Sequence, residues 1–313
     1  MDITALARLE IVAMRPYASA RSTMSADGIL LNANEAPNPL LSEGEFGNMA
    51  LNRYPPPQPG ALVTRLASLY GVEENQLLIT RGSDEGIDLL TRVFCRPQSD
   101  AVLECTPCFG MYRISATIQG ASIVAVPRLP NEAFRVDVDA VCRAIEKDSR
   151  IKLVFLTSPN NPTGDCLELA DLKRIIAACN DRALVVLDEA YIEFSDHDSA
   201  TRLIRQFPQL VVLRTLSKAW AAAGLRCGSV IANPVVIDLL GRVMAPYPLA
   251  SPAIAAAMRV TDEPVRRRQR EAIGQIMRQK QQLLRFLFKQ CWIDALWPGE
   301  ANFILARVGD AAA

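Results

Sequence analysis

Short apolar runs alternate with segments of helical periodicity over most of the chain. Runs rich in Val, Ile and Leu predict strands that are buried on both faces. We expect such strands at residues 76–80, 101–105, 122–126, 152–156, 183–187 and 210–214. Apolar residues at helical spacing predict helices near 61–70, 83–95, 109–118, 137–146, 168–179 and 199–206. This alternation predicts an α/β fold in which helices cover both sides of a mostly parallel sheet.

The two ends of the chain differ from this alternating part. Residues 1–59 are irregular and rich in Asn, Pro and Gly, and proline is not tolerated in a helix interior. After Pro252 the pattern is purely helical, with a long amphipathic segment at 263–289, until an apolar run at 302–308 predicts a strand. We therefore divide the chain into an N-terminal arm with part of a small domain (1–50), a large domain (51–250) and the start of a smaller α/β C-terminal domain (251–313).

Charge and composition narrow the classes of function. The 34 basic residues (Lys and Arg) balance the 34 acidic ones, so we expect neither nucleic acid nor a membrane surface as a partner. No apolar run reaches the ~20 residues that span a bilayer, and the N-terminus lacks a secretion pattern. These observations predict a cytoplasmic protein whose partners are small molecules.

Metal-binding residue types are few or unsuitably placed. The only histidine, His197, excludes multi-histidine metal sites and lies in a polar stretch that predicts an exposed turn. The eight cysteines lie mostly in apolar segments and are expected to be reduced and packed. One Cys-x-x-Cys pair, Cys105 and Cys108, lacks a second pair or a nearby histidine. We therefore expect no metal site.

Polar residues follow three consecutive predicted strands. TSPNNPTG follows 152–156, DEAY follows 183–187, and TLSKAW follows 210–214. Ligands of parallel sheets bind beyond the carboxyl ends of the strands. The three segments would bring an asparagine, an aspartate with a tyrosine, and a lysine to one edge of the sheet.

Lys218 and Asp188 together indicate a particular chemistry. A lysine in apolar surroundings, here between Leu216 and Trp220, loses its proton more easily and can form a Schiff base. Considered alone, Lys218 would be interpreted as a surface lysine at a turn. Asp188, however, ends an apolar run where an unpaired carboxylate is costly, and a cationic ring nitrogen would satisfy it. Pyridoxal phosphate requires such an acid beside its ring nitrogen.

Seven motifs in order resemble those of one family. They are LNANEAP, RYPPPQP, RGSDEGI, DEAYIEF, RTLSKA, GLRCG and APYPL, within a similarity that runs from about Arg15 to Arg307. Together they resemble the histidinol-phosphate aminotransferases, which are class-II, fold-type I transferases. The resemblance implies pyridoxal 5′-phosphate as cofactor and L-histidine biosynthesis as the pathway. It implies that L-histidinol phosphate and 2-oxoglutarate are converted to 3-(imidazol-4-yl)-2-oxopropyl phosphate and L-glutamate.

The same resemblance implies roles for four residues around the cofactor ring. Lys218 would bind the cofactor covalently and then act as general acid and base. Asp188 would pair with the ring nitrogen. Asn161 and Tyr191 would hydrogen-bond the ring oxygen, and Asn161 would also contact substrate. Alone, Asn161 would be interpreted as a turn residue and Tyr191 as a core tyrosine.

Other positions would hold the cofactor phosphate and cover its ring. The helix that begins within RGSDEG offers backbone N–H groups at Ser83 and Asp84, where the helix dipole favours an anion. The resemblance adds the hydroxyl of Ser217 and the guanidinium of Arg226. It also places Phe109, otherwise a core residue, on the face of the ring, where the family usually has tyrosine.

Three further implied residues lie near the N-terminus. Tyr54 would reach the phosphate in the neighbouring subunit, which implies a homodimer with shared sites. Tyr17 and Asn34 would line the substrate pocket. The family continues beyond the position of Ala313 and has there an arginine that binds substrate, so the C-terminal domain is expected to be truncated. A phosphothreonine-type decarboxylase and a catalytically impaired cofactor-binding short form therefore remain alternatives.

Overall fold

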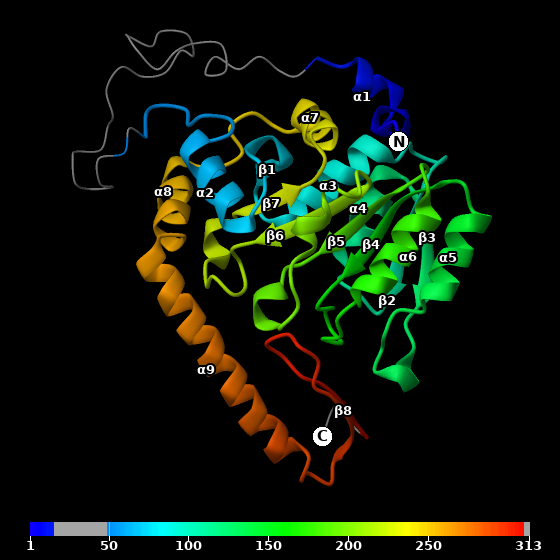
Figure 1. The fold of residues 1–313 in the computed structure, drawn as a ribbon, viewed down its shortest axis with the longest axis vertical. Helices are drawn as coiled ribbons and strands as arrows, with labels where there is room; N and C mark the ends of the chain where they lie inside the picture. Colours follow the sequence, from blue (N-terminus) through cyan, green and yellow to red (C-terminus); the bar gives the residue numbers. More distant parts are fainter. Residues whose placement is uncertain (16–48, 50, 310–313) are drawn as a thin grey trace.

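A seven-stranded sheet forms the centre of the computed structural model, which describes residues 1–15, 49 and 51–309 (Figure 1). Its strands are β1 (Leu77–Thr80), β2 (Ala101–Thr106), β3 (Ser122–Pro127), β4 (Ile151–Thr157), β5 (Leu184–Asp188), β6 (Leu210–Thr215) and β7 (Gly228–Ile231). The order across the sheet is β1-β7-β6-β5-β4-β2-β3. Strands β6, β5, β4, β2 and β3 pair in parallel, whereas β7 is antiparallel to both neighbours. The prediction of a mostly parallel sheet is confirmed.

Helices cover both faces of this sheet. One face packs against α1 (Leu9–Ala13), α3 (Ser83–Phe94), α4 (Met111–Gln119) and α7 (Pro234–Val243). The other packs against α2 (Gly60–Tyr70), α5 (Val138–Lys147), α6 (Leu169–Cys179) and α8 (Ser251–Val260). Alternate residues of a strand enter alternate cores: in β5, Val185 belongs to one cluster and Val186 to the other. This two-sided burial explains why the central strands consist mainly of apolar residues.

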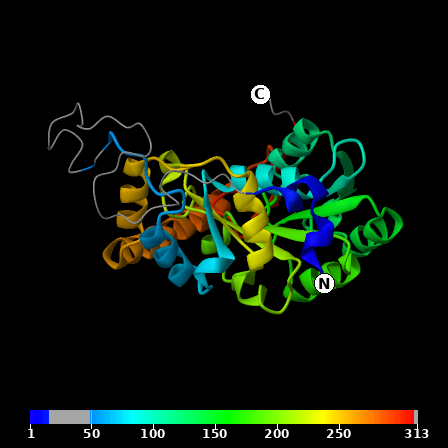
Figure 2. The same ribbon diagram turned by 90° about the horizontal axis from the view of Figure 1, so that it is seen from above.

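The C-terminal segment extends away from the sheet and returns to it. The long helix α9 (Glu263–Leu287) leads to an antiparallel pair of strands, β8 (Ile293–Trp297) and β9 (Leu305–Val308). The loop between them contributes Ala301 and Phe303 to a third apolar cluster, which also contains Tyr191 and Met277 of α9. Seen from above, α8 and α9 lie at one end of the molecule and α5 and α6 at the other (Figure 2).

Several expected elements differ from the structure. The helix expected at 199–206 is only a 3-10 turn (Ala200–Leu203), in which Ser199 caps the start and the Thr201 hydroxyl donates to the Tyr70 carbonyl. The expectation that the chain after Pro252 is helical up to residue 302 was wrong, because β8 precedes that point.

Strand β3 is not buried on both faces, since it lies at the edge of the sheet. Strand β7 and helix α7 were not expected. In the part of the chain that the structure describes, no helix has both the length and the apolar character needed to cross a membrane.

Candidate functional site

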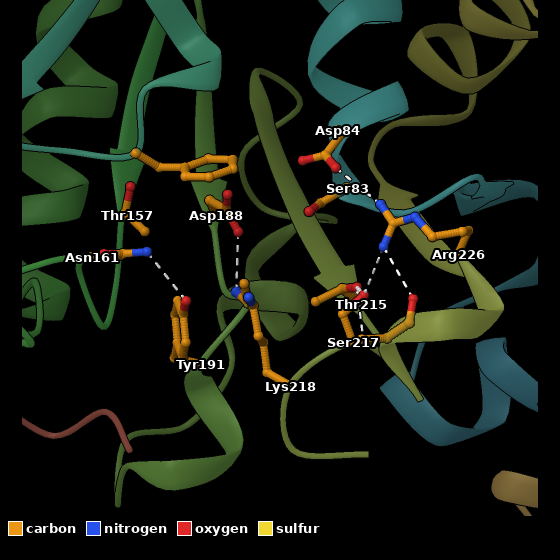
Figure 3. A pocket seen from close by; sticks show the side chains of 13 residues that line it. Ser83, Asp84, Thr157, Asn161, Asp188, Tyr191, Thr215, Ser217, Lys218 and Arg226 are labelled. Carbon is orange, nitrogen blue, oxygen red and sulfur yellow. Dashed lines mark hydrogen bonds and ion pairs between the residues drawn. The ribbon is translucent and has the colours of Figure 1, made fainter. Parts of the chain in front are cut away.

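A pocket opens at the edge of the sheet where the parallel strands end (Figure 3). Its lining comes from the ends of β4, β5 and β6, from the start of α3, and from the loops that follow the strands. The lining residues are Ser83, Asp84, Phe109, Thr157, Asn161, Asp188, Ala190, Tyr191, Thr215, Ser217, Lys218, Ala223 and Arg226. Residues more than 140 positions apart in the sequence thus meet in one cavity, at the location expected for a ligand in this class of sheet.

Asp188 is the last residue of β5 and lies at the buried end of the pocket. Its side chain is 2% exposed, and its two oxygens accept hydrogen bonds from the Tyr112 hydroxyl (2.9 Å) and the Ala190 N–H (3.0 Å). Burial raises the pKa of Asp188 to about 6, although both hydrogen bonds act to lower it. A cation brought next to this carboxylate would offset the cost of its burial.

Tyr112 of α4 is a site residue that the sequence analysis missed. The side chain is fully buried and its ring stacks on Phe155 of β4 with the centroids 4.7 Å apart. Its hydroxyl bonds both Asp188 and the Thr157 hydroxyl, the latter at 2.8 Å. The available signal was an aromatic residue with a polar tip on the apolar face of a helix beside the sheet.

Lys218 lies in the loop after β6 and points into the pocket. The expectation of apolar surroundings was only half correct: Leu216 and Trp220 are buried in the core, but Lys218 itself is exposed. The chain turns between these residues, so that the flanking side chains enter the core and the lysine faces the cavity. Its Nζ lies 5.4 Å from the centroid of the Tyr191 ring.

Asn161 and Tyr191 lie on one wall of the pocket and are joined to each other. The Asn161 amide donates a hydrogen bond of 3.2 Å to the Tyr191 hydroxyl. Tyr191 is buried, and Phe303 from the C-terminal hairpin meets its ring edge-on with the centroids 5.2 Å apart. Tyr191 is therefore both a core residue and a pocket residue, which the sequence analysis had treated as alternatives.

The opposite end of the pocket is suited to an anion. Helix α3 begins there at Ser83, and within the described residues no side chain caps its first turn. Arg226 lies across this helix end, with Nη1 3.5 Å from the Ser217 hydroxyl and Nη2 3.0 Å from a carboxylate oxygen of Asp84. A Cβ at Gly82 would lie 2.7 Å from Arg226 Nη2, so glycine makes room for the guanidinium.

The remaining predicted residues have different positions. Phe109 is half-buried at the pocket and meets Tyr112 edge-on at 5.8 Å between centroids. Tyr54 lies outside the pocket of its own chain, where its ring stacks on Tyr247 at 4.5 Å. Tyr17 and Asn34 lie outside the described residues.

The chemistry of this pocket follows from its arrangement of charge. It has a helix end with a guanidinium at one end, a buried carboxylate at the other, and an exposed amine between them. Such a cavity suits an anionic ligand that carries a positive centre and reacts with an amine.

Known proteins are similar to this chain in sequence and in fold. The sequence profile of the aminotransferase class I and II family matches residues 27–313. The histidinol-phosphate aminotransferase of Cronobacter sakazakii is 40% identical over 314 aligned positions, which cover 100% of this chain and 85% of that protein.

A protein of Erwinia carotovora atroseptica described as a histidinol-phosphate aminotransferase has a crystal structure with a TM-score of 0.74 at 27% identity, covering 88% of this chain and 80% of that one. The histidinol-phosphate aminotransferase of Sinorhizobium meliloti in complex with pyridoxal-5′-phosphate has the same fold, with a TM-score of 0.75 at 22% identity over 83% of this chain and 69% of that one.

Proposed function

Because this chain belongs to the aminotransferase class I and II family, we propose that it transfers the amino group of L-histidinol phosphate to 2-oxoglutarate with pyridoxal 5′-phosphate as cofactor. The products are 3-(imidazol-4-yl)-2-oxopropyl phosphate and L-glutamate, and the pathway is L-histidine biosynthesis. The proposal depends on the similarity, over the whole chain, to a protein named for that activity. It also depends on a pocket that contains both Lys218 and Asp188.

The residues of the pocket fit this cofactor. Asp188 offers the negative partner that a protonated ring nitrogen needs, and its burial is costly without one. The start of α3, Ser217 and Arg226 offer N–H, hydroxyl and guanidinium donors to a phosphate, in a space that depends on the missing Cβ of Gly82. When bound, the cofactor supplies the electron sink that stabilises negative charge at the substrate carbon.

The protein's own groups hold and move protons around that carbon. The amine of Lys218 is exposed to the cavity. It can therefore take a proton from the carbon of the amino donor and later return one to the carbon of the amino acceptor. Asn161 and Tyr191 would hydrogen-bond the ring oxygen of the bound cofactor, and their mutual hydrogen bond fixes the Tyr191 hydroxyl. Phe109 lines the pocket and would cover one face of the bound cofactor ring.

A homodimer belongs to the same proposal. Tyr54 is 50% exposed and lies outside its own pocket, as expected for a residue that completes the site of a second subunit. Tyr17 and Asn34 would line the substrate side of the pocket. The division of the chain near residue 250 into a large domain and a smaller C-terminal one is also proposed.

The direct test is product formation by the purified, cofactor-loaded protein. With L-histidinol phosphate and 2-oxoglutarate we expect glutamate and the ketone phosphate in equal amounts, and no glutamate when either substrate is omitted. Release of carbon dioxide from phosphothreonine without any glutamate would identify a decarboxylase instead. Cofactor binding without turnover of either substrate would identify a catalytically impaired form.

A further inference from the structure

Cys166, His197 and Glu300 meet at a junction outside the pocket. Cys166 lies in the loop between β4 and α6, His197 between two 3-10 turns after β5, and Glu300 in the loop between β8 and β9. Their donor atoms (a thiol sulfur, a ring nitrogen and a carboxylate oxygen) all lie within 4.8 Å of one another, and each residue is half-buried. Three distant segments thus place three different metal-ligating atoms in one location.

The distances are close to those of a metal site. His197 Nε2 and Glu300 Oε1 are 3.2 Å apart, and two such ligands at ~2.0–2.1 Å from a tetrahedral zinc ion lie about 3.3 Å apart. The sulfur of Cys166 lies within 4.8 Å of both atoms, so it has to approach by no more than about 1 Å to reach the ~2.3 Å length of a zinc–sulfur bond. Rotation of a half-buried side chain can supply that movement.

The backbone around the cluster is held in place independently of the three side chains. The Glu300 N–H donates to the Gly164 carbonyl at 2.6 Å. A Cβ at Gly164 would lie 2.8 Å from the Gly299 Cα, so the two loops are in close contact. Glu300 is therefore presented to Cys166 and His197 by rigid backbone, which lowers the entropy cost of assembling a site.

A thiol and a carboxylate at the junction suit a divalent cation that binds sulfur. A bound cation would displace the thiol proton to solvent and would be neutralised by the thiolate and the carboxylate. Lys280 is the adjacent cation: its ammonium donates to the carbonyls of Gly299 (2.9 Å) and Ala301 (2.5 Å), so it is already oriented toward the backbone.

We propose that Cys166, His197 and Glu300 bind one zinc ion, with water as the fourth ligand. This site departs from the sequence expectation of no metal, which considered ligands close together in the sequence. The zinc ion would link Glu300 of the C-terminal hairpin to Cys166 and His197, which lie in loops of the large sheet. Phe303 of the same hairpin already contacts Tyr191. The inference does not depend on the reaction that the pocket catalyses.

The test uses the cofactor-loaded full chain, stripped of metal and titrated with Zn²⁺ and separately with Co²⁺. We expect one high-affinity zinc ion per chain, and visible d–d bands of tetrahedral cobalt that carry thiolate character. C166S, H197N and E300Q should each weaken zinc binding by at least ~100-fold, since losing even an outer hydrogen-bond partner of a ligand costs ~10–100-fold. The control is C291S, which removes an exposed cysteine away from the junction.

Each result decides the question. Zinc binding that C166S and E300Q abolish and C291S retains supports the site, provided that far-ultraviolet circular dichroism shows all variants folded. Zinc binding that persists in C166S, or cobalt spectra that are octahedral in the wild type, overturns it. If C166S does not fold, E300Q decides, because its side chain is 42% exposed and a glutamine fits the same space.

Discussion

At the scale of single residues, the buried carboxylate of Asp188 makes the stability of the protein depend on pH. Its pKa is raised to about 6 by burial, whereas the unfolded chain has the ordinary value of 3.8. The folded state therefore binds the proton more tightly than the unfolded state. The resulting stabilisation is complete well below pH 3.8 and is lost as the pH rises through about 6, to a total of roughly 3 kcal/mol.

Asp188→Asn should reveal this cost in the cofactor-free protein. We expect the free energy of unfolding of the variant, relative to wild type, to rise by roughly 2 kcal/mol between pH 4 and pH 7, because part of the effect is already lost at pH 4. Urea unfolding at pH 4, 5.5 and 7 measures it, with the exposed Asp196→Asn as a control that should show no such trend. A difference between variant and wild type that does not change with pH would contradict the assignment of the proton to Asp188.

The Tyr112 hydroxyl bonds Asp188, and we expect Tyr112 to act on the proposed reaction through that carboxylate, as a positioning residue. Its hydroxyl lowers the pKa of Asp188 by a hydrogen bond, so Tyr112→Phe should raise that pKa further. We expect the acidic limb of the pH–rate profile to move to higher pH, with a stability loss of about 1 kcal/mol. The control, Tyr70→Phe, alters another buried tyrosine that does not bond Asp188. An unchanged acidic limb in Tyr112→Phe would show a purely structural role.

Sequence reasoning at this scale depends on whether a residue stands out from its neighbours. Asp188 does, because a carboxylate directly after buried apolar residues has no structural reason to be there. Tyr112 does not, because a tyrosine at helical spacing is also a normal core residue. Its role follows only from the contact between α4 and β5, which a three-dimensional structure provides.

At the scale of elements, the junction between α3 and β7 builds the anion end of the pocket. A Cβ at Gly228, the first residue of β7, would lie 2.5 Å from the carbonyl carbon of Gly82 and 2.7 Å from the backbone nitrogen of Ser83. The start of α3 can therefore approach the strand only because residue 228 is a glycine.

Gly228→Ala should push the start of α3 away from β7. We expect a loss of about 1–3 kcal/mol in the free energy of unfolding, as for other overpacked positions. We also expect weaker binding of inorganic phosphate and of the cofactor. The matched control is Gly241→Ala inside α7, where a Cβ would meet open space among the described residues and should stabilise the helix by up to ~1 kcal/mol. Equal stability changes in the two variants would contradict the packing argument.

The elements that were predicted and those that were missed differ in how they are buried. The central strands are predictable because both faces are covered and most of their residues are apolar. Strand β7 has only four residues and includes Gly228 and Ser229, so it lacks that signature. Strand β8 is half-exposed and pairs only with β9, and its sequence, IDALW, has no uniform apolar character.

At the scale of the whole molecule, the proposed homodimer can be tested by a complementation experiment. If Tyr54 serves the site of the other subunit, Tyr54→Ala and Lys218→Ala chains, mixed and reassociated, form hybrid dimers with one intact site. We expect about a quarter of wild-type activity in the mixture, because half of the dimers are hybrids with one intact site of two.

The controls for this experiment are the separate variants and a mixture that is not reassociated. The mixture that is not reassociated should be no more active than the separate Tyr54→Ala and Lys218→Ala variants. A reassociated mixture that is no more active than the average of its parents would show that each site is built from one chain.

The C-terminal segment shows the limit of prediction at this scale. Its helical part followed from periodicity, but the return of the hairpin to Tyr191 did not, because Ala301 and Phe303 carry no pattern that names their partner. Burial against a distant segment leaves little local trace in a sequence.

The reversed direction of β7 restricts how this protein can be altered. The connection from β6 to β7 leaves and re-enters the sheet at the same edge, closed by a 3.0 Å hydrogen bond from Leu216 N–H to the Cys227 carbonyl. Lys218 and Arg226 are thereby separated by a fixed length of chain. Extra residues inserted within 217–226 would therefore change the relative positions of Lys218 and Arg226. The short turn at 148–150, at the opposite edge of the sheet, is a better position for an inserted tag.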